Sequence, residues 1–112
     1  VRLAIARGQE IGNLERVLFF ERALDGETYA RMGAVCAMAG YYKEATIVYE
    51  RAVQMGVRTV PVFNNLGVMY DALKEYGKAI GAFETVLALD PENADARHNL
   101  QVVRRRLEEA GK

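Results

Sequence analysis

Few side chains in this sequence could do chemistry. His98 is the only histidine and Cys36 is the only cysteine. Asp95 lies three residues before His98 and could orient its imidazole, but on a helix this spacing is typical of a surface contact. A single thiol excludes an internal disulfide and a four-cysteine metal site, and glycine-rich phosphate-binding motifs are absent from the sequence. We therefore predict no enzymatic activity and no metal or other cofactor.

The composition predicts one folded domain. The 112 residues include 15 Lys plus Arg and 15 Asp plus Glu, so the net charge is zero, and 51% are hydrophobic. This apolar fraction is typical of folded chains. No apolar run approaches the ~18 residues that a membrane span requires, so we predict no membrane insertion. The start at Val1 and the lack of a signal segment favour a piece of a longer protein; the compartment stays open, with the cytoplasm favoured.

The sequence repeats itself at an offset of 34 residues, with residues 60–93 aligning on residues 26–59 without a gap. The matching slots of the later window hold Phe63, Leu66, Gly67, Tyr70, Tyr76, Ala79, Phe83, Val86 and Pro91. Those of the earlier window hold Tyr29, Met32, Gly33, Cys36, Tyr42, Ala45, Tyr49, Ala52 and Val57. Residue chemistry is retained at nearly every slot.

This pattern of aromatic, Leu-Gly, Tyr, Ala, aromatic and Pro residues at a period of 34 resembles the tetratricopeptide repeat family. The resemblance implies an all-α fold in which antiparallel helix pairs stack into a right-handed superhelix. It also implies a non-catalytic scaffold for protein–protein interaction, because such a stack presents a concave surface to a ligand.

The residues themselves also predict helices. Apolar side chains recur at spacings of three and four in both halves of residues 60–93, which predicts two amphipathic helices per repeat. Gly33 and Gly67 fall inside helices, where glycine costs about 1 kcal/mol relative to alanine, so we expect a neighbouring helix to approach them closely. Ala45 and Ala79 are the expected small partners of these glycines.

Two large aromatic residues and two turns complete this expected repeat. Tyr49 and Phe83 are expected to fill the space between one repeat and the next. The tight turns inside the two pairs are expected at Gly40 and at Lys74-Glu75.

The two ends of the chain depart from the pattern. Residues 1–25 are interpreted as a degenerate or partial repeat whose register is unresolved. Residues 94–112 begin a further period, with Asn93 or Asp90 as the expected N-cap, but no second helix follows. We predict that this segment is a capping helix with Leu100, Val103 and Leu107 facing inward and residues 104–106 facing outward.

The family resemblance places the ligand groove on the first helix of each pair, one residue after the aromatic slot and at every third or fourth residue from there. The implied peptide-binding residues are Ala30, Ala34, Met38, Asn64, Asn65, Val68, Asp71, His98, Val102 and Arg105. Small apolar side chains dominate this set, which favours a peptide or partner protein with apolar side chains, its backbone amides pairing with Asn64 or Asn65. The alternative is that Ala30, Ala34 and Met38 only pack against a neighbouring helix.

The resemblance also allows one kind of ligand to be excluded. One branch of the family binds chaperone C-termini through Lys, Arg and Asn side chains that clamp two carboxylates. The corresponding positions are here Ala30, Ala34, Asn65, His98 and Val102. A ligand carboxylate would lack its cationic partners at these positions, so we predict that the chain does not bind a chaperone C-terminal carboxylate tail.

Nucleic acid is a competing class of partner. Val35-Cys36 and residues 54–63 faintly resemble pentatricopeptide repeats, which bind single-stranded RNA, and residues 104–106 are three consecutive arginines. The zero net charge and the period of 34 argue against this, as do arginines that point around most of the helix circumference. The sequence therefore disfavours nucleic acid.

Self-assembly is a further alternative. Leu3, Ile5, Phe19 and Phe20 would leave an apolar end uncovered if the first helix is incomplete. Such ends stack onto copies of the same chain, so a homo-oligomer formed through the N-terminal helices is the alternative function.

Overall fold

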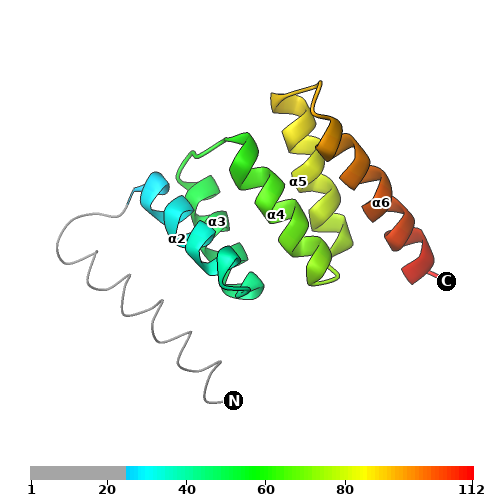
Figure 1. Cartoon of the computed structure of the whole chain (residues 1–112), viewed down its shortest axis with the longest axis horizontal. Coiled ribbons are helices and arrows are strands. Elements are labelled where there is room, and N and C mark those ends of the chain that lie inside the picture. The colour runs from blue at the N-terminus through cyan, green and yellow to red at the C-terminus, as the bar shows by residue number, and fades with distance from the viewer. Residues whose placement is uncertain (1–24) are drawn as a thin grey trace, which may run out of the picture.

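The computed structural model describes residues 25–112, which form five helices and no strand. The helices are α2 (Gly26–Met38), α3 (Tyr42–Gln54), α4 (Val60–Ala72), α5 (Tyr76–Leu89) and α6 (Ala94–Ala110). Helices α2 and α3 form one antiparallel pair, α4 and α5 form the next, and α6 lies along α5 at the C-terminal end (Figure 1). The predicted all-α fold of stacked helix pairs is confirmed. The predictions for residues 1–24, including those for Leu3, Ile5, Phe19 and Phe20, lie outside the described residues.

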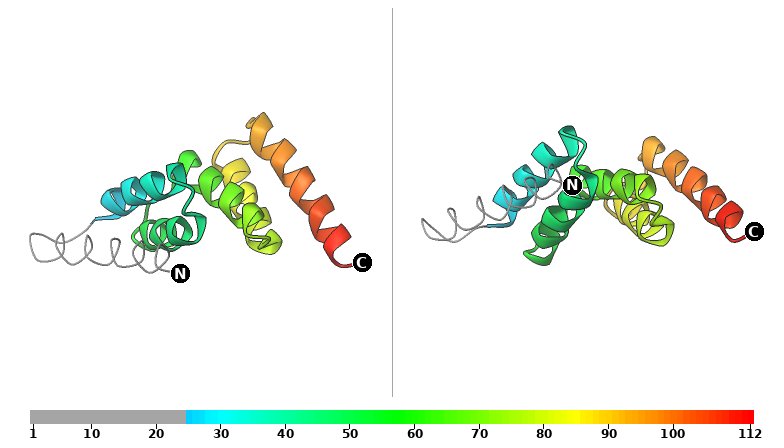
Figure 2. Two further views of the ribbon diagram at one scale, coloured as in Figure 1. Left: turned by 60° about the horizontal axis from the view of Figure 1, so that its bottom comes forward. Right: turned by 90° about the horizontal axis from the view of Figure 1, so that it is seen from below.

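The two pairs are built alike. Helices α2 and α4 begin at Gly26 and Val60, and α3 and α5 begin at Tyr42 and Tyr76, so both sets of starts are separated by the 34 residues of the sequence repeat. Packing between the pairs runs mainly through α3 and α4. The pairs follow one another along the molecule and are rotated relative to each other (Figure 2).

The turn inside each pair also repeats. Gly40 has a φ of 83° and Lys74, its equivalent, has a φ of 62°, so both occupy the left-handed region. In each turn the next residue bonds back to the first helix: the Tyr41 amide donates to the Cys36 carbonyl (2.9 Å) and the Glu75 amide to the Tyr70 carbonyl (2.8 Å). The two turns that the sequence predicts are therefore confirmed.

Short polar side chains begin three of the helices. Asp25 Oδ1 accepts from the Thr28 amide (2.7 Å), Thr59 Oγ1 from the Val62 amide (3.4 Å) and Asn93 Oδ1 from the Ala96 amide (2.9 Å). Each contact satisfies a first-turn amide that has no partner inside its own helix. Of the two predicted caps for α6, Asn93 is the one that forms.

The glycine that repeats inside α2 and α4 faces an aromatic ring of the same pair in both helices. A Cβ built on Gly33 would lie 2.8 Å from Tyr49 Cδ1, and one built on Gly67 would lie 2.6 Å from Phe83 Cε1. A planar ring can lie this close to a helix backbone only where no Cβ projects. The expectation that Ala45 and Ala79 supply the opposing small surface stays a prediction.

The rings also join the pairs into one core. A continuous cluster of buried side chains runs from Cys36 in α2, through Tyr49 and Phe83, to Val103 in α6. Tyr49 and Phe83 are 2% and 1% exposed. The two rings thus fill space inside their own pair as well as toward the next one, where the sequence predicted only the second role.

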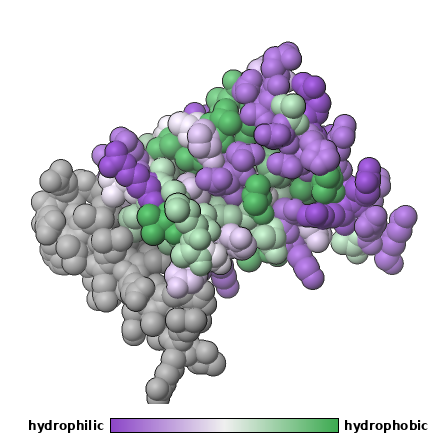
Figure 3. Space-filling model, viewed as in Figure 1, coloured by the Kyte–Doolittle hydropathy of each residue, from purple (hydrophilic) through white to green (hydrophobic). Residues whose placement is uncertain are grey.

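Helix α6 covers the apolar side of α5. Leu100 and Val103 are buried, as predicted, but Leu107 is 44% exposed, so the prediction that it faces inward is wrong. Helix α6 has 17 residues and α5 has 14, so the last turn of α6 extends past its neighbour. The surface in view over α6 is mostly hydrophilic (Figure 3).

Candidate functional site

The predicted groove residues lie on the first helices, α2, α4 and α6, but they are not equally available to a ligand. Ala30 and Ala34 are half-buried and pack against the core, as the packing alternative expects. Met38, the last residue of α2, is 88% exposed. Asn64 is half-buried.

Asn65 is engaged inside the protein. Its Nδ2 donates to the hydroxyl of Tyr49 at 3.0 Å, which links α4 to α3. This contact connects residues 16 apart in the sequence and holds the amide in place. Of the predicted groove residues on α4, Asn64, Val68 and Asp71 therefore remain for contact with a ligand.

A pocket of about 320 Å³ lies between α4 and α6 and brings four predicted residues together. Its lining residues are Val68, Asp71, Phe83, His98, Asn99, Val102, Val103 and Arg106. Val68 is 46% exposed and His98 is exposed, whereas Phe83 and Val103 are buried and form the apolar floor. Ala30, Ala34, Met38, Asn64 and Arg105 do not line this pocket.

One charged pair bridges the pocket. Arg106 Nη1 of α6 donates to Asp71 Oδ2 of α4, and this bond and the carboxylate charge raise the pKa of Arg106 above its ordinary value. The side chain of Asp71 is 18% exposed and that of Arg106 is 50% exposed. Asp71 Oδ1 is buried and has no hydrogen-bond partner among the described residues.

Sequence reasoning missed Arg106. The spacing rule of three or four residues after Val102 allows both Arg105 and Arg106, and the prediction took Arg105. Arg106 and Asp71 are 35 residues apart in the sequence. Which of the two arginines pairs with Asp71 therefore depends on how α6 packs against α4, which the sequence spacing does not show. The repeat offset does not help, because Asp71 plus one period of 34 falls on Arg105.

The cluster of three arginines is divided among different partners. Arg104 Nη2 lies 3.2 Å from Glu84 Oε2 on α5, and Arg106 pairs with Asp71 on α4. Arg105 is exposed. Two of the three positive charges are therefore compensated by carboxylates, which weakens the case for a phosphate-binding stripe.

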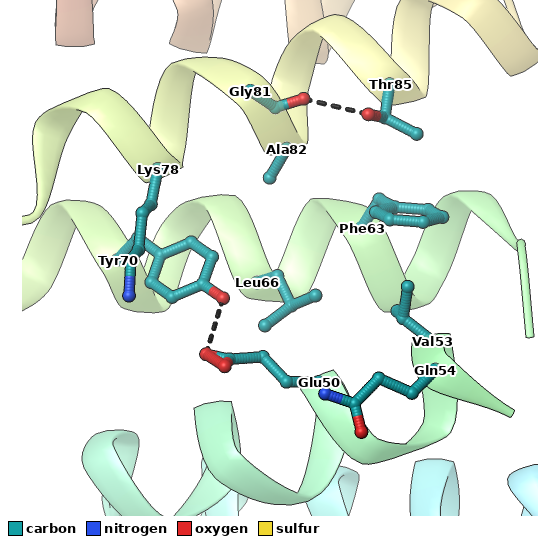
Figure 4. A pocket seen from close by; sticks show the side chains of 10 residues that line it. All are labelled: Glu50, Val53, Gln54, Phe63, Leu66, Tyr70, Lys78, Gly81, Ala82 and Thr85. Carbon is teal, nitrogen blue, oxygen red and sulfur yellow. Dashed lines mark hydrogen bonds between the residues drawn. The ribbon is translucent and has the colours of Figure 1, made fainter.

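A second pocket, of about 340 Å³, lies between the two helix pairs and is drawn in Figure 4. Residues of α3, α4 and α5 line it: Glu50, Val53, Gln54, Phe63, Leu66, Tyr70, Lys78, Gly81, Ala82 and Thr85. The Tyr70 hydroxyl donates to Glu50 Oε1 (2.8 Å), and the Lys78 ammonium lies 5.7 Å from the Tyr70 ring centroid. Burial, with the hydrogen bond to Glu50, raises the pKa of Tyr70 far above its usual range.

This second pocket was not predicted, although the repeat offset carries a signal for it. Gly81 occupies the slot that Ile47 fills in the preceding pair, and a Cβ built on Gly81 meets nothing within 4 Å. A smaller residue at an exposed position of α5 leaves room above Phe63 and Leu66.

Neither residue singled out for reactivity has the surroundings of a catalytic group. Cys36 is buried, and burial raises the pKa of its thiol, which lowers its reactivity. His98 is exposed on α6. Residues 25–112 hold no cluster of three or more His, Cys, Asp or Glu side chains placed to bind a metal ion.

Comparison with known families agrees with the geometry. Residues 60–93, which contain α4 and α5, match the model of the tetratricopeptide repeat. Residues 60–93 are therefore assigned to the tetratricopeptide repeat family. Tetratricopeptide repeats generally mediate protein–protein interactions, and the family typically supplies scaffolds without catalytic activity.

One similar protein is the tetratricopeptide repeat domain-containing protein PYG7, chloroplastic, of Arabidopsis thaliana. It is 45% identical over 49 residues, which are 44% of this chain and 16% of the relative. The chain thus spans about one sixth of the length of this larger tetratricopeptide repeat protein. No helix within residues 25–112 combines the length and apolar character that crossing a bilayer requires.

Proposed function

We propose that this tetratricopeptide repeat chain is a non-catalytic interaction module that holds a peptide segment of a partner protein in the groove formed by α2, α4 and α6. The pocket between α4 and α6 carries this proposal, because Val68, Asp71, His98 and Val102 line it together from two separate first helices. A concave site with an apolar floor and a few polar groups at its edge suits an extended or helical peptide.

The chemistry of the groove favours a ligand with apolar side chains. Val68 and Val102 offer aliphatic surface at the pocket wall, and Asn64, one turn before Val68, is half-buried with an amide that can pair with a peptide backbone. A chaperone C-terminal carboxylate tail remains excluded in this proposal, because Ala30, Ala34 and Val102 supply no cation at the clamp positions.

A pair of double variants tests the groove. We expect Asn64→Ala with Val68→Glu to abolish the binding of peptides selected from a random nonapeptide library, because the new carboxylate would be desolvated beside the bound apolar side chains. The matched control is Gln54→Ala with Met55→Glu. Met55 is 47% exposed against 46% for Val68, but it lies at the end of α3 and does not line the groove pocket.

Surface plasmon resonance measures the affinity, and far-ultraviolet circular dichroism monitors the helices. The groove variant should lose binding with its helical signal intact, while the control should bind as the wild type does. Retained affinity in the folded groove variant, or equal loss in both variants, would contradict the proposed site.

A second candidate function is association between copies of the chain. Val35, Met38 and Ile47 on α2 and α3 are 67%, 88% and 60% exposed, an unusual amount of apolar surface for one helix pair. Sedimentation velocity at several concentrations tests this candidate. A sedimentation coefficient that rises with concentration in the wild type but not in Val35→Glu with Ile47→Glu supports it, and a constant monomer value removes it.

A further inference from the structure

The carboxylate of Asp71 is only half satisfied. Its Oδ2 accepts from Arg106 Nη1, whereas Oδ1 is buried without a hydrogen-bond partner among residues 25–112. Buried acceptors in folded proteins are nearly always paired, because burial removes the water that would otherwise donate to them. An unpaired oxygen in the lining of the groove pocket therefore points to a donor that a bound molecule supplies.

The position of Arg106 limits what that donor can be. Asp71 Oδ1 is shielded from solvent. The guanidinium of Arg106 is bonded to the other oxygen of this carboxylate, and the Arg106 side chain is half-exposed. We reason that a ligand atom reaches Oδ1 only when Arg106 turns toward solvent. The carboxylate would then lose its counter-charge in a mostly buried place, so the incoming donor must itself be a cation.

We propose that Asp71 binds an arginine side chain of the peptide ligand, and that Arg106 occupies this position when no peptide is bound. This inference rests on the proposed function and specifies its ligand. A guanidinium presents two parallel N–H groups and can bond both carboxylate oxygens, whereas Arg106 bonds only Oδ2. Val68, Val102 and Phe83 supply the apolar walls along which the methylene stem of the arginine lies.

The exchange keeps the local charge constant. One guanidinium leaves Asp71 and another takes its place, so the carboxylate is paired before and after binding. The bound state adds a hydrogen bond at Oδ1 and returns Arg106, already 50% exposed, to water. Arg106 is thus an internal competitor of the ligand, held on the capping helix α6.

The test uses the full chain and a random nonapeptide phage library. Peptides are selected on the wild type, on Asp71→Asn and on Arg106→Gln. The matched control is Arg104→Gln, because the Arg104 side chain lies on the same helix, is 56% exposed and pairs with Glu84 of α5 outside the pocket. The best wild-type peptide is then synthesised with arginine, with citrulline, which keeps the shape but loses the charge, and with leucine at the enriched position. Dissociation constants are measured for every protein–peptide pair, and circular dichroism melts verify that each variant is folded.

The wild type should enrich arginine beside apolar residues, and citrulline should weaken binding by about tenfold or more. In Asp71→Asn the arginine and citrulline peptides should bind equally weakly. Arg106→Gln should bind the arginine peptide at least as tightly as the wild type, and Arg104→Gln should match the wild type.

Other outcomes overturn the inference. Enriched peptides without arginine, or peptides that bind Asp71→Asn as well as the wild type, would remove it while leaving the groove function intact, provided that Asn64→Ala with Val68→Glu still abolishes their binding. Weaker binding to Arg106→Gln would show that Arg106 contacts the ligand and is not displaced. A library from which no peptide is enriched would overturn both the inference and the proposed function.

Discussion

At the scale of single residues, two contacts between a glycine and a ring determine how closely the paired helices pack. Gly33 lies under the ring of Tyr49 and Gly67 lies under the ring of Phe83. Each glycine destabilises its own helix relative to alanine, and burial of the apolar ring surface against it stabilises the fold and offsets this loss. Gly81, also inside a helix, has no such neighbour. The same residue type therefore has opposite consequences at two positions of one helix pair.

We expect Gly67→Ala to destabilise the protein by about 1–3 kcal/mol, because the new Cβ would lie 2.6 Å from the ring of Phe83, a residue that is 1% exposed and belongs to the core. Gly81→Ala should stabilise it by about 0.5–1 kcal/mol, since alanine is the better helix former and its Cβ meets open space. Urea unfolding followed by circular dichroism measures both changes. Equal shifts of the two midpoints would contradict this account of the glycine slots.

The N-cap of α2 makes stability depend on pH. The hydrogen bond from Thr28 lowers the pKa of Asp25 below its ordinary value of 3.8. A carboxyl group whose pKa is lowered on folding stabilises the fold above its unfolded pKa and loses that contribution as the pH falls through the folded value. We expect the stability difference between the wild type and Asp25→Ala to be constant from pH 7 to about pH 5 and to shrink below about pH 4. Urea titrations at a series of pH values measure this, and a difference that does not change with pH would refute the assignment.

At the scale of helices, most of the fold could be predicted from the sequence. Apolar spacing and the offset of 34 residues predicted the helix pairs and the turns at Gly40 and Lys74, because these features depend on local backbone and side-chain preferences. The inward face of α6 was predicted correctly for Leu100 and Val103 and wrongly for Leu107. Periodicity assigns a face to a helix but does not show where the neighbouring helix ends.

Helix α6 provides a matched pair of leucines. We expect Leu100→Ala to destabilise the protein by about 2–5 kcal/mol, because Leu100 is 6% exposed and its loss leaves a cavity against the shared core. Leu107→Ala should cost less than about 1 kcal/mol, since Leu107 is 44% exposed. Thermal melts of the two variants measure the difference. A cost at Leu107 as large as that at Leu100 would mean that the last turn of α6 is covered.

At the scale of the whole molecule, the pairs must be coupled, and the couplings are what the sequence could not reveal. Asn65 bonds Tyr49 across 16 residues, Tyr70 bonds Glu50 across 20, and Arg106 bonds Asp71 across 35. No local pattern encodes such pairs, because they depend on how one repeat turns against the next. The candidate site was accordingly predicted only in part: Val68, Asp71, His98 and Val102 meet in one pocket, whereas Asn65 serves the junction between the pairs and Arg106 was missed.

In a stack of repeats each unit contacts only its neighbours, so cooperative unfolding depends on the junctions. Two hydrogen bonds that involve tyrosine hydroxyls join α3 to α4: Asn65 donates to the Tyr49 hydroxyl, and the Tyr70 hydroxyl donates to Glu50. We expect Tyr49→Phe with Tyr70→Phe to lower the free energy of unfolding by about 2 kcal/mol, at about 1 kcal/mol for each bond, and to broaden the urea transition. The broadening is expected because the two pairs can then unfold separately while both rings keep their packing.

Tyr42→Phe is the matched control, since Tyr42 is 40% exposed and lies at the start of α3, away from the junction bonds. A double variant that keeps one sharp transition with an unchanged slope would show that apolar contact alone couples the pairs.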